Sequence, residues 1–128
     1  MGRVVHFELH AADPDRARLF YEEVFGWEIA RVGVMPYWLV RTGPEDEPGI
    51  DGGIVQRRGS EPAVGQPVNA YVCTVQVDDL DGTLGRVTDA GGELVVERQP
   101  IAGVGWHAYV KDSEGNLLGV LQPDPAAD

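Results

Sequence analysis

The sequence repeats its landmarks at a constant offset of 66 residues, and this repeat constrains the fold more than any other feature. The matched landmarks are two aspartates, two glycines and two short apolar runs: Asp13 and Asp79, Gly26 and Gly92, and GIVQ at 53–56 and GVLQ at 119–122. In each copy the aspartate precedes apolar residues at helical spacing and the glycine follows them, as expected of a helix N-cap and a helix end. Three matches at one offset predict two copies of a single folding unit.

Each copy is predicted to run strand, helix, strand, strand, strand. Runs of apolar residues predict the strands, while clusters of Gly, Pro and acidic residues predict the loops between them. In the first copy the predicted strands are 4–9, 27–32, 37–41 and 53–56, with a helix between Asp13 and Gly26. In the second copy the predicted strands are 71–77, 93–97, 106–111 and 118–121, with a helix between Asp79 and Gly91.

The predicted fold class is α+β, with two βαβββ repeats that form a curved mixed sheet around a cleft. One helix cannot cover both faces of four strands, so each copy leaves one face of its strands open. Two open faces joined edge to edge would enclose a cleft, which is a natural site for a small molecule. At 128 residues we expect a single domain, with a first unit 1–56, a linker 57–67, a second unit 68–122 and a frayed tail 123–128.

The charge balance excludes several classes of partner. The chain has a formal net charge of −11, and such a surface repels nucleic-acid phosphates and anionic lipid. No apolar run approaches the about 20 residues of a membrane-spanning helix. Cys73 is the only cysteine, so no disulfide can form within the chain, and its apolar context predicts a buried, unreactive thiol. We expect a cytoplasmic protein that binds neither nucleic acid nor membranes.

Two stretches of the sequence carry a family signature. They are the opening run, with HFEL at 6–9, DP at 13–14, RA at 16–17, FY at 20–21 and FGW at 25–27, and the hairpin DSEGN at 112–116. Together with the repeat, they resemble the vicinal oxygen chelate superfamily, which contains glyoxalases, extradiol dioxygenases and bleomycin resistance proteins. The resemblance implies the same fold and a homodimer, but it fixes no reaction because one fold hosts many activities.

The resemblance also implies where a metal would bind. In metal-dependent members the ligands come from the first and last strand of each unit, at the positions occupied here by His6, Gly53, Val72 and Gly119. Only His6 has a donor atom, whereas a functional divalent site needs at least three protein ligands. The resemblance therefore implies no cofactor. In the alternative, His6 and Glu8, two residues apart on one strand face, bind a divalent metal with help from His107 or water.

The predicted ligand-binding residues are polar or aromatic side chains on strands expected to line the cleft: His6, Glu8, Trp38, Thr74, Gln76, Trp106 and His107. Alternation turns the first two toward the cleft if Phe7 and Leu9 pack under the helix. Aromatic walls suit a flat or sugar-like ligand.

Each of these residues also has a purely structural interpretation. Tyr37 and Trp38 are adjacent, so they cannot both face the cleft, and at least two of the aromatic side chains belong to the core in this interpretation. An arginine would then pair with Glu8, His6 would cap the floor through a hydrogen bond, and the polar residues of strand 71–77 would be ordinary surface residues.

Three functions are open on the sequence alone. The first is a metal-independent binding domain for a small organic molecule. The second is a lyase, isomerase or dioxygenase that holds a metal through His6 and Glu8. The third is a non-catalytic module that dimerises through strand edges. Motifs of serine hydrolases, P-loop nucleotidases and dithiol redox proteins are absent, and Asp112 and Glu114 are interpreted as parts of a tight turn, so no catalytic residue is assigned.

Overall fold

The computed structural model describes residues 2–128, which fall into two compact units, 2–61 and 62–128. The boundary between the units lies within the segment 57–67, which the sequence marks as a linker. Each unit contains one helix and four strands, so each can be described by itself.

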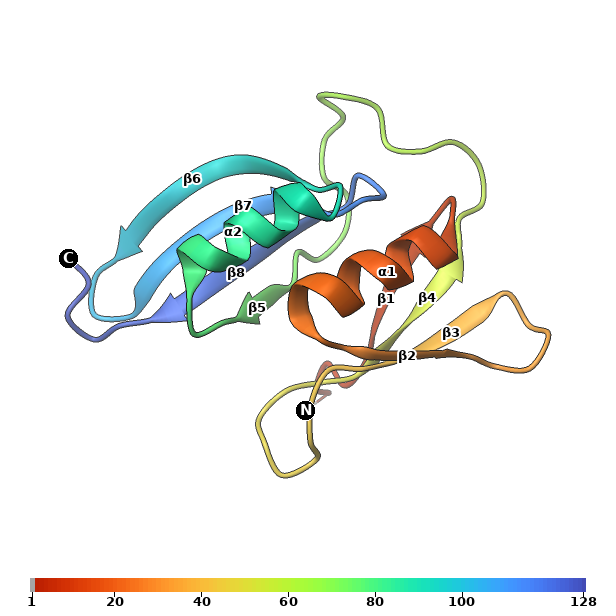
Figure 1. Ribbon diagram of the computed structural model, residues 1–128, viewed down its shortest axis with the longest axis horizontal. Helices are drawn as coiled ribbons and strands as arrows, with labels where there is room; N and C mark the ends of the chain where they lie inside the picture. Colours follow the sequence, from red (N-terminus) through yellow and green to blue (C-terminus); the bar gives the residue numbers. More distant parts are fainter. Residues whose placement is uncertain (1) are drawn as a thin grey trace. The chain divides into compact units, whose positions relative to one another are not determined.

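The first unit is one mixed sheet with one helix on it (Figure 1). Its elements are β1 (Phe7–Ala11), α1 (Pro14–Phe25), β2 (Glu28–Arg31), β3 (Tyr37–Arg41) and β4 (Gly52–Gln56). The strand order is β1-β4-β3-β2, with β1 parallel to β4 and the other pairs antiparallel. The parallel pair is possible because the long connection through α1, β2 and β3 separates its two strands.

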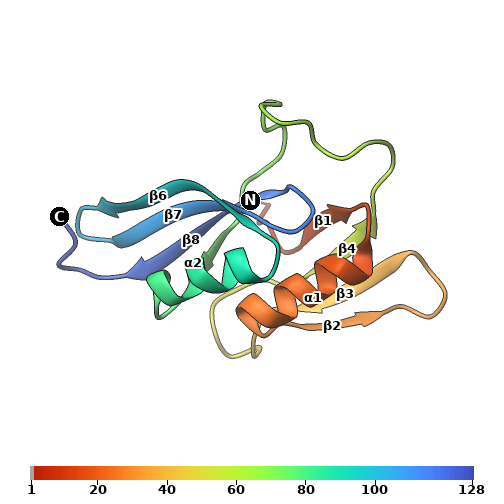
Figure 2. The ribbon, with the colours of Figure 1, turned by 45° about the horizontal axis from the view of Figure 1, so that its top comes forward.

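The second unit has the same topology. Its elements are β5 (Thr74–Gln76), α2 (Leu80–Asp89), β6 (Glu93–Ile101), β7 (Gly105–Lys111) and β8 (Leu117–Pro123). The strand order is β5-β8-β7-β6, again with a parallel pair formed by the first and last strands. Figures 1 and 2 show α2 along one face of this sheet. The predicted α+β class and the two βαβββ repeats are therefore confirmed.

Both helices begin at the predicted N-caps. The Asp13 carboxylate accepts a hydrogen bond from Arg16 N at 3.1 Å, and the Asp79 carboxylate accepts one from Gly82 N at 3.1 Å. Helix α1 ends at Gly26, whose φ of 72° is the left-handed conformation that glycine adopts without strain. Helix α2 ends two residues sooner in its repeat, and its left-handed glycine is Gly91. Among residues 2–128, neither helix is long and apolar enough to cross a membrane.

The core of the first unit lies between α1 and one face of its sheet. One cluster of its buried residues comprises Ala11, Ala17, Trp38, Val40 and Ile54, and Phe7, Leu9, Trp27 and Ile29 pack against it. Since side chains alternate along a strand, burial of residues 38 and 40 turns residues 37, 39 and 41 to the face that α1 does not cover. The sheet therefore has one apolar face under the helix and one open face.

The second unit divides its faces in the same way. Leu80, Thr83 and Val87 of α2 are fully buried, as are Ala108, Val110 and Val120 of the sheet. Residues 107 and 109 of β7, and 119 and 121 of β8, consequently lie on the open face.

Two sequence predictions about the second unit are wrong. Strand β5 begins at Thr74 rather than at residue 71, so Tyr71 is 96% exposed and Cys73 is exposed instead of buried. The register of β5 against β8 has three pairs, with 119–121, and Cys73 contributes only its carbonyl oxygen, which accepts a hydrogen bond from Gly119 N at 2.8 Å. The apolar pattern alone did not reveal this short register.

The C-terminal residues are packed, not frayed. Ala127 O accepts a hydrogen bond from Gly103 N, and Asp124 N donates to Val104 O, both at 3.0 Å. These bonds tie the segment to the turn between β6 and β7, and Ala127 is only 5% exposed. Backbone hydrogen bonds to a distant turn have no signature in the local sequence, which explains the wrong prediction.

Adjacent residues of β3 test the assignment of the two faces. Trp38→Ala should lower the free energy of unfolding by about 3–5 kcal/mol, because it empties a large site in the core. Leu39→Ala is the matched control: Leu39 is 55% exposed, and its truncation should cost less than about 1 kcal/mol. Urea denaturation measures both losses, and equal losses would contradict the assignment.

Candidate functional site

The open face of the first unit brings together residues from three strands. Glu8 of β1 and Leu39 of β3 flank Gly53 of β4, each as its direct partner in the ladder. His6 lies two residues before Glu8, just outside β1, and Tyr37 lies two residues before Leu39. This cluster, called the Tyr37 cluster, contains His6, Glu8, Tyr37, Leu39 and Gly53.

Tyr37 reaches across Gly53 to His6. The phenol oxygen lies 2.8 Å from His6 Nε2, and which atom donates depends on the tautomer of the imidazole. A Cβ atom added to Gly53 would collide with the hydroxyl oxygen and Cζ of Tyr37. The space above Gly53 is thus filled by the end of the Tyr37 ring, and any larger residue at position 53 would displace it.

The environment of Tyr37 keeps its hydroxyl protonated. Burial raises the pKa of Tyr37 above its ordinary value of about 10, and the negative charge of nearby Glu8 raises this pKa further. A protonated phenol can donate one hydrogen bond and accept others. The cluster therefore offers a neutral donor, an imidazole and a carboxylate side by side.

The open face of the second unit carries an equivalent cluster around Gly119, called the His107 cluster. It contains Thr74 of β5, His107 and Tyr109 of β7, and Gly119 of β8. A Cβ atom added to Gly119 would stand 2.7 Å from His107 Nε2 and 2.8 Å from Thr74 Oγ1. The His107 and Tyr109 rings pack edge to face, with centroids 4.6 Å apart.

The two clusters follow one geometric rule. Tyr37 pairs with Val55, and His107 pairs with Leu121, so each ring is attached two residues beyond its glycine along the ladder. Each ring then leans back over the glycine toward the first strand of its unit, where it meets His6 or Thr74. A ring from the third strand thus fills the space above a glycine of the last strand in both units.

Not all of the predicted site residues lie on the open faces. His6, Glu8, Thr74 and His107 belong to the clusters, and Gln76 lies on the same side of β5 as Thr74. Trp38 is instead 7% exposed in the core, where Arg31 stacks on its ring at 4.9 Å from the centroid. It cannot line the open face, so the predicted position of this residue is wrong.

Trp106 also lies on the helix-covered side of its sheet. It alternates with buried Ala108 on β7, and its Nε1 donates to Asp124 Oδ2 at 3.2 Å. Arg98 stacks on its ring at 4.4 Å from the centroid and pairs with Asp81 of α2 at 2.8 Å. Trp106 thus joins the C-terminal segment to the sheet, and its predicted role as a wall of the site is wrong.

The sequence prediction missed Tyr37 and Tyr109. Both lie on the open side of a third strand because their neighbours, Trp38 and Val110, are buried. The sequence did contain a signal. Where an apolar or indole side chain is next to a tyrosine on a strand, the core face is expected to take the former, because its exposure to water costs more free energy. Tyr37 was considered, but Trp38 was assigned in its place.

The hairpin 112–116 has a structural role. Asp112 Oδ1 accepts hydrogen bonds from Glu114 N at 2.8 Å and Asn116 N at 2.9 Å, and Gly115 takes a φ of 80°. The aspartate therefore closes the turn by bonding its own backbone, as the sequence predicted. These carboxylates contribute to turn formation, and we assign them no chemistry.

Comparisons with known proteins agree with this architecture. Residues 3–43 match the family model "Bleomycin resistance protein-like N-terminal". The chain is 30% identical over 127 residues to "Putative glyoxylase CFP32" of Mycobacterium bovis, an alignment that covers 97% of this chain. These matches support the vicinal oxygen chelate superfamily as the one that this chain resembles. The chain spans only 45% of the length of that mycobacterial relative.

One further relative and one solved structure extend the comparison. The chain is 28% identical over 134 residues to "Probable lactoylglutathione lyase" of Vibrio parahaemolyticus, covering 98% of this chain and 94% of that protein. The fosfomycin resistance protein FosX of Listeria monocytogenes, solved with Mn(II) and a dihydroxypropylphosphonic acid, superposes with a TM-score of 0.71 at 16% identity. That superposition covers 97% of this chain and 92% of the other, and it shows a shared fold.

The residues at the superfamily's metal positions do not fit a metal. Of the four positions, Gly53, Val72 and Gly119 lack donor atoms. The space that a carboxylate side chain would need at Gly53 is filled by Tyr37. The corresponding space at Gly119 is filled by His107 and Thr74. No group of three or more His, Cys, Asp or Glu side chains with metal-binding geometry occurs among residues 2–128. We derive no chemistry through a metal at these positions.

Gly53→Ala tests whether the Tyr37 ring fills the glycine position. The added methyl group collides with the phenol, so the free energy of unfolding should fall by about 1–3 kcal/mol. Combining it with Tyr37→Ala should relieve the collision, giving a loss smaller than the sum of the single losses. Urea denaturation of the four proteins measures the coupling.

Gly85→Ala on α2 is the control for this cycle. An added Cβ at Gly85 meets nothing within 4 Å, and alanine in a helix should stabilise the protein by about 0.5–1 kcal/mol. Additive effects of the Gly53 and Tyr37 substitutions would show that the ring does not occupy the space above Gly53.

Glu8→Gln tests the electrostatics of the Tyr37 cluster. It removes a nearby negative charge while burial remains, so the pKa of Tyr37 should fall toward its ordinary value. Tyrosinate absorbance followed as the pH is raised, with Tyr37→Phe as the reference, measures this pKa. An unchanged titration in Glu8→Gln would contradict the contact.

The same shift affects stability at alkaline pH. The folded protein holds the Tyr37 proton more tightly than the unfolded chain, because its folded pKa is raised. The stabilisation is therefore complete below pH of about 10 and is lost as the pH rises through the folded pKa. In Glu8→Gln this loss should begin at the same pH, because the unfolded chain sets its onset, but it should be smaller and complete at a lower pH.

Proposed function

We propose that this chain is a metal-independent binding domain for a small organic molecule, which it holds on the open faces of its sheets. The observation that carries the proposal is the filling of both glycine positions by ring side chains. The resemblance implies that metal-dependent proteins of this superfamily have carboxylates at those positions. In this chain a phenol and an imidazole from neighbouring strands occupy the space instead. This chain spans about half the length of the mycobacterial relative, and the proposed function is that of this chain alone.

The chemistry of the clusters supports a ligand rich in oxygen functions on an apolar frame. Tyr37, His6, Thr74 and His107 offer hydroxyl and imidazole groups, which recognise hydroxyl and carbonyl groups by direct hydrogen bonds. Leu39, 55% exposed between Tyr37 and Arg41 on β3, offers apolar contact beside them. A few placed polar groups on a largely apolar floor are typical of small-molecule sites.

A metal-dependent lyase, isomerase or dioxygenase is the competing function. It draws support from the relative named "Probable lactoylglutathione lyase" and from FosX, which was solved with Mn(II). In this chain such an enzyme would have to hold its metal through His6 and Glu8 with help from water, since the usual carboxylates are missing. The elemental analysis below separates the two functions.

The proposal includes a cytoplasmic homodimer. The single cysteine suits a reducing compartment. The net charge of −11 disfavours anionic membranes and nucleic acid as partners. Edge strands β2 and β6 leave backbone groups that a second copy can cover.

The proposal is tested by metal content and thermal stability. Dialysed protein should contain sub-stoichiometric metal, and Mn²⁺, Ni²⁺ or Fe²⁺ should leave its melting temperature unchanged. A small aromatic ligand at a hundredfold excess over its Kd should add about 2.7 kcal/mol of stability, and so raise the melting temperature by several degrees. Tyr37→Phe should weaken that ligand roughly tenfold, the effect of one lost hydrogen bond.

One result would overturn the proposal in favour of the enzyme. It is stoichiometric metal that stabilises the protein by several degrees and is lost in His6→Ala. Gln76→Ala is a suitable control, since Gln76 lies on the open side of β5 in the second unit and is not one of the residues of the Tyr37 cluster. Its metal content should equal that of the unaltered protein in either case.

A further inference from the structure

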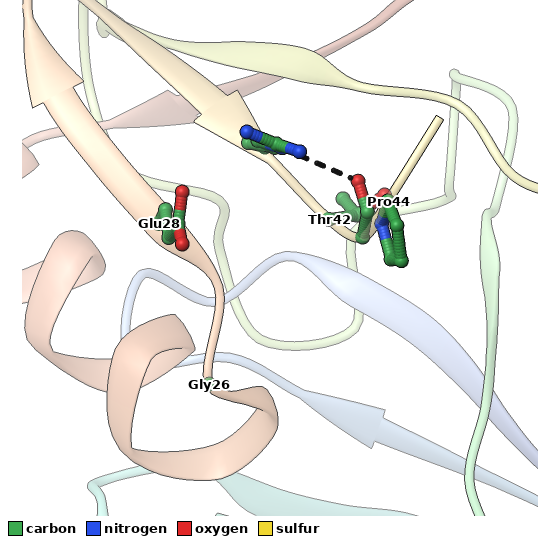
Figure 3. A pocket seen from close by; sticks show the side chains of 6 residues that line it. Gly26, Glu28, Thr42 and Pro44 are labelled. Atoms are coloured by element: carbon green, nitrogen blue, oxygen red, sulfur yellow. Dashed lines mark hydrogen bonds between the residues drawn. The ribbon is translucent and has the colours of Figure 1, made fainter. Parts of the chain in front are cut away.

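A separate cavity lies at the end of the β2–β3 ladder, next to the end of α1 (Figure 3). It has a volume of about 250 Å³ and is lined by Gly26, Glu28, Arg41, Thr42, Gly43 and Pro44. Drug-sized ligands occupy roughly 300–1,000 Å³, so this cavity suits a smaller molecule. None of its lining residues belongs to the Tyr37 cluster.

Two opposite charges line this cavity without pairing. Glu28 and Arg41 are direct cross-strand partners, a placement that brings Cβ atoms to about 5 Å and normally favours an ion pair. Among the ion pairs found in residues 2–128, none includes either residue. A carboxylate and a guanidinium therefore share the lining without pairing with each other, and both residues are exposed to solvent.

The wall on the Arg41 side is held in place. Arg41 Nε donates to Gly43 O at 3.4 Å, drawn as the dashed line in Figure 3, which leaves the terminal guanidinium nitrogens for a ligand. Thr42 Oγ1 donates to Ile50 O, and Thr42 N donates to Asp51 Oδ1, both at 2.8 Å. A wall fixed before binding lowers the ordering cost that a ligand must overcome.

The wall on the Glu28 side favours positive charge. Figure 3 shows Glu28 on β2 just after Gly26, where α1 ends. The carbonyl end of a helix carries partial negative charge, which adds to that of the Glu28 carboxylate. A simple anion would meet this repulsion, and a simple cation would meet the repulsion of Arg41.

We propose that this cavity binds a small zwitterion, a molecule with an ammonium and a carboxylate group such as an α-amino acid. The carboxylate pairs with the Arg41 guanidinium, which can bind it through two parallel hydrogen bonds. The ammonium pairs with the Glu28 carboxylate. Such a ligand neutralises both walls at once, which neither singly charged ion can do. This site is independent of the function proposed for the open-face clusters.

The probe for this proposal is L-alanine, titrated into the folded protein and followed by backbone amide NMR. The amides of Gly26, Thr42 and Gly43 should shift in a saturable way, with a Kd of roughly 1 mM for so small a ligand. Sodium acetate and methylammonium chloride at equal concentration should give shifts at least about fivefold smaller, because each matches only one wall. Equal shifts with all three would overturn the proposal, as would the absence of saturable shifts.

Charge-removing variants complete the test. Glu28→Gln and Arg41→Gln should each weaken L-alanine binding at least about tenfold, the loss expected when one charge-assisted hydrogen bond is removed. The matched control is Glu93→Gln, which removes the same charge from the equivalent cross-strand pair, Glu93 with Lys111, in the second unit. It should bind like the unaltered protein. Unaltered binding in Glu28→Gln and Arg41→Gln, with well-dispersed spectra showing that both are folded, would refute the site.

Discussion

Each sheet of four strands has a single helix to cover it, and this unequal coverage decides the place of every side chain considered above. One face is closed by α1 or α2 and takes the apolar residues, since burial of apolar area is the main stabilising term. The other face receives whatever alternates with those residues. The open faces are therefore a consequence of how the cores are packed, and their polar and aromatic content is set by position along each strand.

Within those open faces, two glycines allow a second layer of organisation. A glycine in a strand normally weakens it, because it adds no side chain to the packing and loses more entropy on folding. Here the cost is offset by the Tyr37 ring over Gly53 and the His107 ring over Gly119. The resemblance implies carboxylate ligands at these two positions in metal-dependent proteins. In this chain a ring occupies the space that a side chain at either glycine would need.

The Glu28–Arg41 cavity illustrates a different consequence of the fold. The register of β2 against β3 places two opposite charges side by side, and the residue after α1 and the loop at Thr42 line the same cavity. The second unit has the corresponding pair Glu93 and Lys111. The two copies of one folding unit can thus carry different sites, because the loops and helix ends around equivalent strands differ.

The local sequence determined a large part of this protein. The 66-residue offset, the N-caps Asp13 and Asp79 and the alternation of the strands predicted two βαβββ units, since caps and periodicity depend only on residues close together in the chain. The family resemblance, and not the local pattern, implied that Gly53 and Gly119 stand where a metal ligand would be. The strand alternation placed His6 and Glu8 correctly on one face.

Only the tertiary structure decided what surrounds those residues. Trp38 and Trp106 lie under their helices, Cys73 lies outside a shortened strand, and the C-terminal segment is tied to a distant turn. Which ring fills the space above each glycine likewise depends on strand pairing. Tyr37 is 16 residues from Gly53 in the sequence, and His107 is 12 residues from Gly119. Strand register and the choice of buried face are settled by packing among distant residues, and no local pattern specifies them.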